Sequence, residues 1–311
     1  MKMKWKKYLP IIGIIIFIYI LLKINILSVF NEIKNASLFY LGIAILFWFI
    51  FELIQTFKWY IIAKKQQIDI PFSKAFKINL MTNFYGFVTP SKIGTVMRAE
   101  YLKKYTKNIG KGMGNFVIDK VLDLVSLFLI VITFSFILKD KFNFISLDYY
   151  FMAFWLLLLI LFLVFYNKER SKSLLRIFYR RFIPKNMHDK AKITFESFYE
   201  DLPKKRFLLS VLVVNIINWI STYFLTYLIG LSLGINLSFD YYLAVLPLVT
   251  LISQIPITIN GLGTREISMI GLFGLFGIGA TKVFSMSILS LFLFGILPAI
   301  IGSFLILRNK D

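Results

Sequence analysis

The chain has 311 residues, 58% of them hydrophobic and 34 of them Phe. Globular domains are only about 45–50% apolar, and here the apolar residues form long runs between basic stretches. The composition therefore excludes an ordinary soluble enzyme and predicts a polytopic membrane protein. Lys and Arg number 36 against 16 Asp and Glu, a net charge of +20. These basic residues flank the apolar runs, so the expected partners are membrane lipids with anionic headgroups and not nucleic acid.

Several kinds of chemistry are absent from the sequence. There is no Cys, which excludes disulfides, a thiolate nucleophile and Cys-based metal sites. The only His is His188, in a basic loop, so neither a His-based zinc site nor a Ser–His–Asp triad is expected. The sequence also has no nucleotide-binding loop. We therefore expect no cofactor, no metal ion and no ATP hydrolysis within the chain.

Six apolar runs have about the 20 residues that a helix needs to cross a membrane. They are residues 9–30, 38–62, 113–138, 148–166, 207–233 and 284–307. The first follows the charged start MKMKWKKY with no small-residue cleavage site after it, which indicates a retained signal anchor. Between the fourth and fifth runs, loop 167–206 contains RSKSLLRIFYRRFI. This pattern predicts a cationic amphipathic helix on the inner leaflet, with a solvated basic connector as the alternative.

Two further apolar regions, residues 78–110 and 241–280, are interrupted by Pro and Gly. The first breaks at Thr89-Pro90 and the second between Pro256 and Gly263. In each region the Pro is followed by a Gly, then by an Arg four positions after that Gly, and then by a Glu. We interpret both as re-entrant helical hairpins that enter from opposite sides. The predicted fold is an all-α integral membrane protein with about six full transmembrane helices and two broken hairpins, in a single domain, 1–311. The similar pattern of the two broken regions predicts an inverted repeat with halves 1–147 and 148–311. The alternative to the six spans and two hairpins is eight full spans.

The distribution of basic residues orients these segments. With the N-terminus inside, the inner segments hold 28 Lys and Arg: 4 at the N-terminus, 10 in 63–112, 12 in 167–206 and 2 at the C-terminus. The outer segments hold only five, namely Lys23, Lys34, Lys139, Lys141 and Lys282. The sequence therefore predicts a multi-pass protein of the cell membrane with both termini in the cytoplasm.

The two breaks are the first candidate site. Non-helical backbone at membrane depth must be buried in protein or line a cavity, and the N–H groups where a helix restarts attract anions. Arg98 and Arg265 each lie about one turn further on, where a guanidinium can donate two hydrogen bonds to a phosphate. Either Arg could instead be an interfacial anchor, an alternative favoured for Arg98 by its basic neighbours. Arg265 has none nearby.

Acidic residues within the spans are the second candidate feature, since such residues are costly and usually functional. Asp119 and Asp123 share a helical face; they are expected either to pair with Arg98, Arg265 or Lys120 or simply to lie near the interface. Glu52 is expected to pair near Lys58 or with an interior Arg. Glu266 follows Arg265 directly, and because adjacent residues point in different directions on a helix, we expect it to meet another cation.

A resemblance to a known family is carried by PSKIGTVMRAEYLKK, DKVLDLVSL, IPITINGLGTREISMIGLFGLFG and LPAIIGSFLIL. Over essentially the whole chain, these runs resemble the flippase-like membrane domain of the lysylphosphatidylglycerol synthase family, which also occurs as a stand-alone membrane protein. Pro256 to Glu266 resembles the family's Pro…Gly-Leu-Gly…Arg-Glu signature. The first signature is similar at Pro90, Gly94 and Arg98, but Thr95 stands where Glu is frequent. The segment Asp119-Lys120 occupies the place of an acidic–Arg pair, and Asp123 matches.

The resemblance implies translocation of lipids or handling of polyprenyl-linked sugars. Aminoacyl transfer belongs to a separate domain of the larger family members, so no synthase activity is expected here. The prediction is a non-enzymatic flippase or transporter that moves an anionic phospholipid or polyprenyl-phosphate-linked lipid through a polar groove at the midplane. The alternatives are an intramembrane headgroup transferase or phosphatase, and a non-catalytic lipid-binding assembly subunit. The predicted substrate-binding residues are Arg98, Arg265, Glu266, Asp119, Asp123, Asn260, Gly261, Gly263, Pro256, Pro90 and Gly94.

Overall fold

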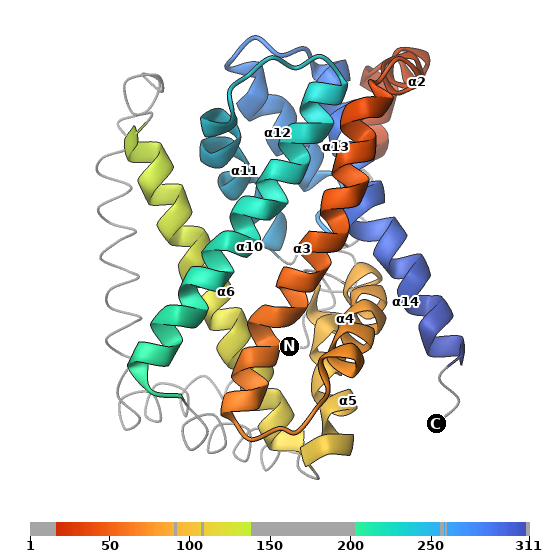
Figure 1. Cartoon of the computed structure of the whole chain (residues 1–311). Coiled ribbons are helices and arrows are strands. Elements are labelled where there is room, and N and C mark those ends of the chain that lie inside the picture. The colour runs from red at the N-terminus through yellow and green to blue at the C-terminus, as the bar shows by residue number, and fades with distance from the viewer. Residues whose placement is uncertain are drawn as a thin grey trace, which may run out of the picture.

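The computed structural model describes residues 17–89, 92–106, 109–137, 203–255, 258 and 260–308. Within these ranges every regular element is a helix, and the long helices run side by side along the height of the molecule (Figure 1). Three stretches are long and apolar enough to cross a membrane: Leu38–Lys65, Arg206–Ser232 and Ala280–Arg308. The prediction of an all-α membrane protein is confirmed. The predicted span 148–166 and the basic loop 167–206 lie outside the described residues.

Three predicted spans correspond to single long helices, because their apolar runs contain no Pro. They are α3 (Leu38–Lys65), α6 (Ile109–Ile137) and α10 (Lys205–Ser232). The last predicted span is also helical throughout but changes its winding in the middle. It consists of α13 (Ala280–Leu291), a π-helical turn η5 (Phe292–Ile296) and α14 (Leu297–Arg308).

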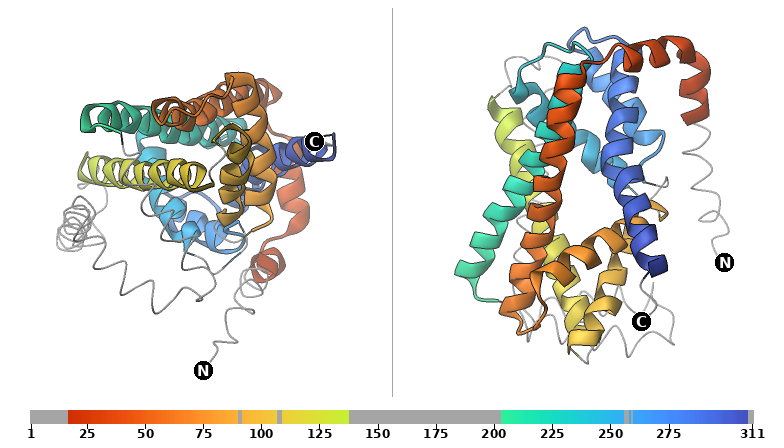
Figure 2. Two further views of the ribbon diagram at one scale, coloured as in Figure 1. Left: turned by 90° about the horizontal axis from the view of Figure 1, so that it is seen from below. Right: turned by 45° about the vertical axis from the view of Figure 1, so that its right-hand side comes forward.

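The first predicted span, 9–30, is wrong at its C-terminal end. Helical residues 17–23 are followed by a break, and α2 (Ile26–Lys34) begins as a separate helix at an angle to them (Figure 2). The Asn25 side chain accepts hydrogen bonds from the N–H groups of Leu27 and Ser28, which is an N-cap. The apolar residues after Asn25 therefore belong to a new helix and do not extend the first one.

Both predicted breaks are present, and they form two short helical hairpins. The first consists of α4 (Phe72–Phe87), the 3-10 turn η2 (Ile93–Val96) and α5 (Met97–Thr106), and the second of α11 (Phe239–Gln254) and α12 (Thr264–Gly274). Figure 1 shows α4 and α5 in the lower half of the molecule and α11 and α12 in the upper half. The hairpins thus enter from opposite ends, as predicted.

Each hairpin packs one of its helices against the helix that follows it in the chain and the other against the helix that follows the other hairpin. In the first hairpin α4 packs against α14 and α5 against α6, whereas in the second α11 packs against α6 and α12 against α13. The helices that precede the hairpins, α3 and α10, pack against each other. This exchange is what an inverted repeat requires. The repeat boundaries 1–147 and 148–311 stay a prediction, because residues 138–202 are not described.

The two hairpin tips meet at one glycine of the π-helical turn. A Cβ atom at Gly295 would lie 2.9 Å from the ring of Phe87, at the end of α4, and 3.3 Å from Nδ2 of Asn260. Gly295 is close to the middle of the helical stretch Ala280–Arg308, about 20 Å from each end at a rise of 1.5 Å per residue. Asn260 therefore lies at mid-depth, which agrees with a re-entrant second hairpin; the total number of spans stays untested.

Candidate functional site

The turn of the second hairpin depends on three residues with positive φ. Asn260, Gly261 and Gly263 have φ values of +50°, +75° and +84°, a region in which glycine carries no steric penalty. After this turn α12 begins at Thr264, and the Gly263 N–H donates a 2.6 Å hydrogen bond to Oε2 of Glu266. The carboxylate of Glu266 thus lies at the positive end of the helix, where an anion is stabilised.

Arg265 and Glu266 form an ion pair with each other, so the expectation that Glu266 would meet a different cation is wrong. Oε1 of Glu266 lies 3.0 Å from Nε and 2.5 Å from Nη2 of Arg265. Ser287 of α13 donates to the same oxygen at 2.9 Å and accepts from Arg265 Nε at 3.0 Å. The long guanidinium side chain folds back beside its neighbour, and Ser287 fixes the pair against α13.

The two members of this pair differ in exposure. Glu266 is fully buried, while the Arg265 side chain is 18% exposed. Among the described residues, Nη1 of Arg265 has no hydrogen-bond partner, because the recorded bonds use Nε and Nη2. One edge of the guanidinium is therefore free to donate to a further acceptor. Pro256, which was predicted to belong to this site, lies outside the described residues.

The first hairpin turns through Lys92, whose φ is +54°. Gly94 follows, and its N–H donates to Oγ1 of Thr89 at 2.7 Å. A Cβ atom at Gly94 would collide with the carbonyl of Tyr85, so only glycine allows this close approach. Thr89 and not an external ligand holds this N–H group. Pro90 lies outside the described residues.

Five charged side chains from three helices form what we call the Lys58 cluster. Nζ of Lys58 lies 3.2 Å from Asp119 and also pairs with Asp123, and Arg98 Nη2 lies 2.8 Å from the other oxygen of Asp119. Lys120 completes the cluster, 3.2 Å from Asp123. The predicted pairs Asp119–Arg98 and Asp123–Lys120 are present. Neither acid has a recorded pair with Arg265.

Sequence reasoning missed Lys58 as the centre of this cluster. Lys58 is buried in α3 and also donates to Oδ1 of Asn215, on α10, at 3.4 Å. The available signal was that a lysine in an otherwise apolar span needs a partner. The pairing itself joins residues 65 positions apart in the chain, which no local pattern indicates.

Arg98 is buried between aromatic rings and an acid, with its Nε left without a hydrogen-bond partner among the described residues. It is 5% exposed, and its guanidinium carbon lies 4.9 Å from the ring centre of Trp59 and 5.4 Å from that of Phe116. With Asp119 these rings form a cation–π and ion-pair site. Arg98 therefore fastens α5 to α3 and α6, and it does not extend toward the surface as an interfacial anchor would.

Two further cations lie within electrostatic range of Lys92 at the first hairpin tip. Lys92 of the first tip is exposed, yet it lies within electrostatic range of Lys120 and Arg265, and of the acids Glu52 and Asp123. Lys120 is 45% exposed and Arg265 18% exposed. Lys92, Lys120 and Arg265 are named the cationic triad below. Each member keeps accessible surface, so together they offer positive charge to a ligand that enters between the hairpins.

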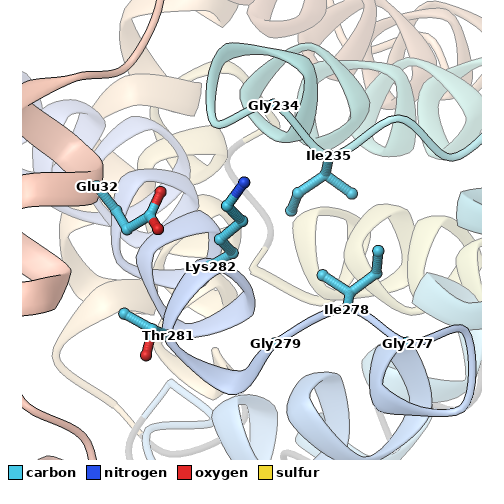
Figure 3. A pocket seen from close by; sticks show the side chains of 8 residues that line it. All are labelled: Glu32, Gly234, Ile235, Gly277, Ile278, Gly279, Thr281 and Lys282. Atoms are coloured by element: carbon cyan, nitrogen blue, oxygen red, sulfur yellow. The ribbon is translucent and has the colours of Figure 1, made fainter.

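A separate pocket of about 390 Å³ lies at the opposite end from the first hairpin. Figure 3 shows Glu32 and Lys282 facing it, with Gly234 and the segment 277–279 along its edge. None of the predicted substrate-binding residues lines this pocket. Among the described residues, no group of three His, Cys, Asp or Glu side chains is placed to hold a metal ion.

Comparison with known proteins shows two similarities. The family described as the lysylphosphatidylglycerol synthase TM region matches residues 10–302. A UPF0104 membrane protein of Pyrococcus horikoshii is 23% identical over 327 residues, and the similarity covers 98% of each of the two chains. The match extends across both hairpins, the Lys58 cluster and the Arg265–Glu266 pair.

Proposed function

Since the chain belongs to the family of lysylphosphatidylglycerol synthase transmembrane regions, we propose that it moves an anionic lipid across the membrane. The substrate class is a phospholipid or a polyprenyl-phosphate-linked lipid. The observation that carries the proposal is the partly exposed Arg265, about one turn after the mid-depth tip at Asn260, whose Nη1 is unpaired among the described residues. Lys92 and Lys120 add positive charge within electrostatic range of each other. In this proposal the chain is a transporter and not an enzyme.

The phosphate is proposed to accept a hydrogen bond from Nη1 of Arg265. The positive charges of Lys92 and Lys120 would attract it further. Glu266 supports this role, because its carboxylate already occupies the anion position at the start of α12 and neutralises Arg265 when no lipid is present. An incoming phosphate would share Arg265 with Glu266 and would not require the buried pair to break. Arg98, engaged by Asp119, would then shape the site without contacting the phosphate.

The opposed hairpins suggest how the lipid would cross. Each hairpin reaches mid-depth from one side of the membrane only. Movement of one tip would therefore open the cationic triad toward the side from which that hairpin enters, while the other hairpin keeps the opposite side closed. On the predicted orientation, the lower end in Figure 1 would face the cytoplasm. The lipid tails would remain in the bilayer while the headgroup passes between the tips.

The test uses purified protein in vesicles that contain fluorescent phosphatidylglycerol or a fluorescent polyprenyl phosphate. Translocation is read from the fraction of label that a membrane-impermeant quencher cannot reach, and chromatography of the lipids detects any product. We expect translocation without a new lipid species. A chemically altered lipid would favour the headgroup transferase or phosphatase instead, and lipid binding without movement would favour an assembly subunit.

Variants of the Arg265–Glu266 pair test the binding site. Arg265→Ala alone would leave the buried Glu266 without its cation and, among the described residues, bonded only to Gly263 and Ser287, which endangers folding. Arg265→Ala/Glu266→Gln removes both charges together and should fold but lose lipid binding at least tenfold, since the guanidinium supplies a two-pronged donor. Arg308→Ala, at the exposed end of α14, is the control. Normal lipid binding by the folded double variant would refute the proposed phosphate contact.

A further inference from the structure

A buried acid outside the phosphate site, Glu52, has an unusual set of partners. It lies near the middle of α3 and is 1% exposed. Its Oε2 accepts from Nδ2 of Asn79 at 2.9 Å and from Nδ2 of Asn83 at 3.2 Å, and its Oε1 accepts from Asn83 at 3.3 Å. Trp59 Nε1, which can only donate, lies 3.3 Å from Oδ1 of Asn79. That contact fixes the orientation of the Asn79 amide, so its N–H group must face Glu52.

The other buried acids of the membrane region are paired differently. Asp119, Asp123 and Glu266 each have a Lys or Arg nitrogen within ion-pair distance. Glu52 has none among the described residues, and both of its partners are neutral amides. A carboxylate in an apolar interior without a counterion is unfavourable as an anion and favourable as a neutral acid. The two amide donors stabilise the carboxylate in part, and the remaining stabilisation depends on a nearby cation.

That cation is Lys92, whose Cβ would lie 3.7 Å from a Cβ atom at Gly86, about one turn of α4 beyond Asn83. Lys92 is the charged group within electrostatic range of Glu52. On α6, Asp119 and Asp123 are paired with Lys58, and Lys120 is paired with Asp123. On α4, Asn79 and Asn83 contact Glu52, while Lys74 and Lys77 lie nearer the start of that helix. On α10 the amide Asn215 faces Lys58, and η5 carries no ionisable side chain.

From this geometry we propose that Glu52 is a proton-binding site that couples the uptake of one anionic lipid to the uptake of one proton. The inference rests on the transport function proposed above. When the site is empty, Lys92 balances the Glu52 carboxylate. When a lipid phosphate draws Lys92 away, Glu52 loses the positive charge of Lys92 and binds a proton from water on the side where the lipid enters. An O–H bond forms at Glu52, and it breaks when the lipid leaves on the other side and Lys92 returns.

The coupling is reciprocal, because two ligands that favour the same state strengthen each other's binding. Lipid and proton therefore move in the same direction. A lower pH on the entry side should speed translocation by up to about tenfold per pH unit, since the proton is a co-substrate. Glu52→Gln keeps the size and hydrogen bonding of the neutral acid, so this variant should still bind lipid but lose the response to a pH gradient.

The experiment has two parts, both with wild type, Glu52→Gln and the matched control Glu100→Gln, whose side chain is 51% exposed on α5. The first measures movement of fluorescent phosphatidylglycerol in vesicles with and without an imposed pH gradient. The second adds short-chain phosphatidylglycerol to detergent-solubilised protein in weak buffer and follows a pH-indicator dye. We expect one proton taken up per lipid by wild type and by Glu100→Gln, and none by Glu52→Gln.

The outcomes separate the two proposals. Translocation that ignores the pH gradient, or proton uptake that is equal in wild type and Glu52→Gln, would overturn the role of Glu52 and leave the transport function standing. Glu52-dependent proton uptake without any translocation would instead refute transport and support the proton site. If the purified protein binds no anionic lipid at all, both proposals are refuted.

Discussion

Replacing Lys58 by Met would remove the central cation of a buried cluster with little change in side-chain size. Lys58 is 4% exposed, and its partners Asp119 and Asp123 are 2% and 10% exposed. Removing one member of a buried ion pair costs about 3–5 kcal/mol, because the remaining charge stays buried without compensation. Arg98 and Lys120 still face the two acids, so we expect a loss near the lower limit, about 3 kcal/mol.

A loss of that size lowers the melting temperature by about 6–12 °C, at roughly 2–4 °C per kcal/mol for a chain of a few hundred residues. The assay is the apparent melting temperature of detergent-solubilised protein, followed by size-exclusion chromatography after heating. Lys58→Met/Asp123→Asn removes one charge of each sign and should recover more than half of the loss. A melting temperature for Lys58→Met within 2 °C of the wild type, or a double variant that is no more stable than the single one, would contradict the assigned role.

Three further predictions concern other parts of the fold. Arg98→Lys should destabilise the protein by about 1–3 kcal/mol, measured by the same heating assay, because lysine cannot both stack on the two rings and pair with Asp119. Gly295→Ala should slow lipid translocation several-fold in the vesicle assay, since its Cβ would press on Phe87, whereas Gly271→Ala, with open space around its Cβ, should not. A single cysteine at Asn236 should react with an impermeant thiol reagent added outside intact cells, and one at Asp69 should react only after permeabilisation; the reverse pattern would invert the predicted orientation.

The long helices and the two breaks were predictable because their signals are local. Apolar runs without Pro give α3 and α10, and the Pro and Gly residues mark both hairpins. Asn25 shows the limit of this approach, because Ile26, Leu27, Val29 and Phe30 continue the apolar run past it. Only the capping side chain separates α2 from the preceding helix, and a count of hydrophobic residues does not register a cap.

The sequence identified several charged residues of the candidate site, but it did not identify most of the residues that they contact. Asp119 and Asp123 were expected to meet cations, and they do. The partner they share, Lys58, comes from a different helix, and Glu52 meets two asparagines of the first hairpin where a cation was expected. Such contacts depend on how helices rotate against one another. Hydrophobicity hardly constrains that rotation in a membrane, where lipid and core are equally apolar.

The π-helical turn at Phe292–Ile296 sets the angular phase of the last helical stretch. A helix advances by about 100° per residue, and a π-helical turn accommodates one additional residue in a single turn. The stripe of side chains that α13 presents to α12 is therefore out of phase with the stripe that α14 presents to α4. Deleting one residue from the turn would rotate α14 by about 100° and carry Gly302 away from the Leu80 carbonyl that it now approaches closely. That one extra residue lets a single continuous helix serve as the wall of two hairpins that arrive from opposite sides.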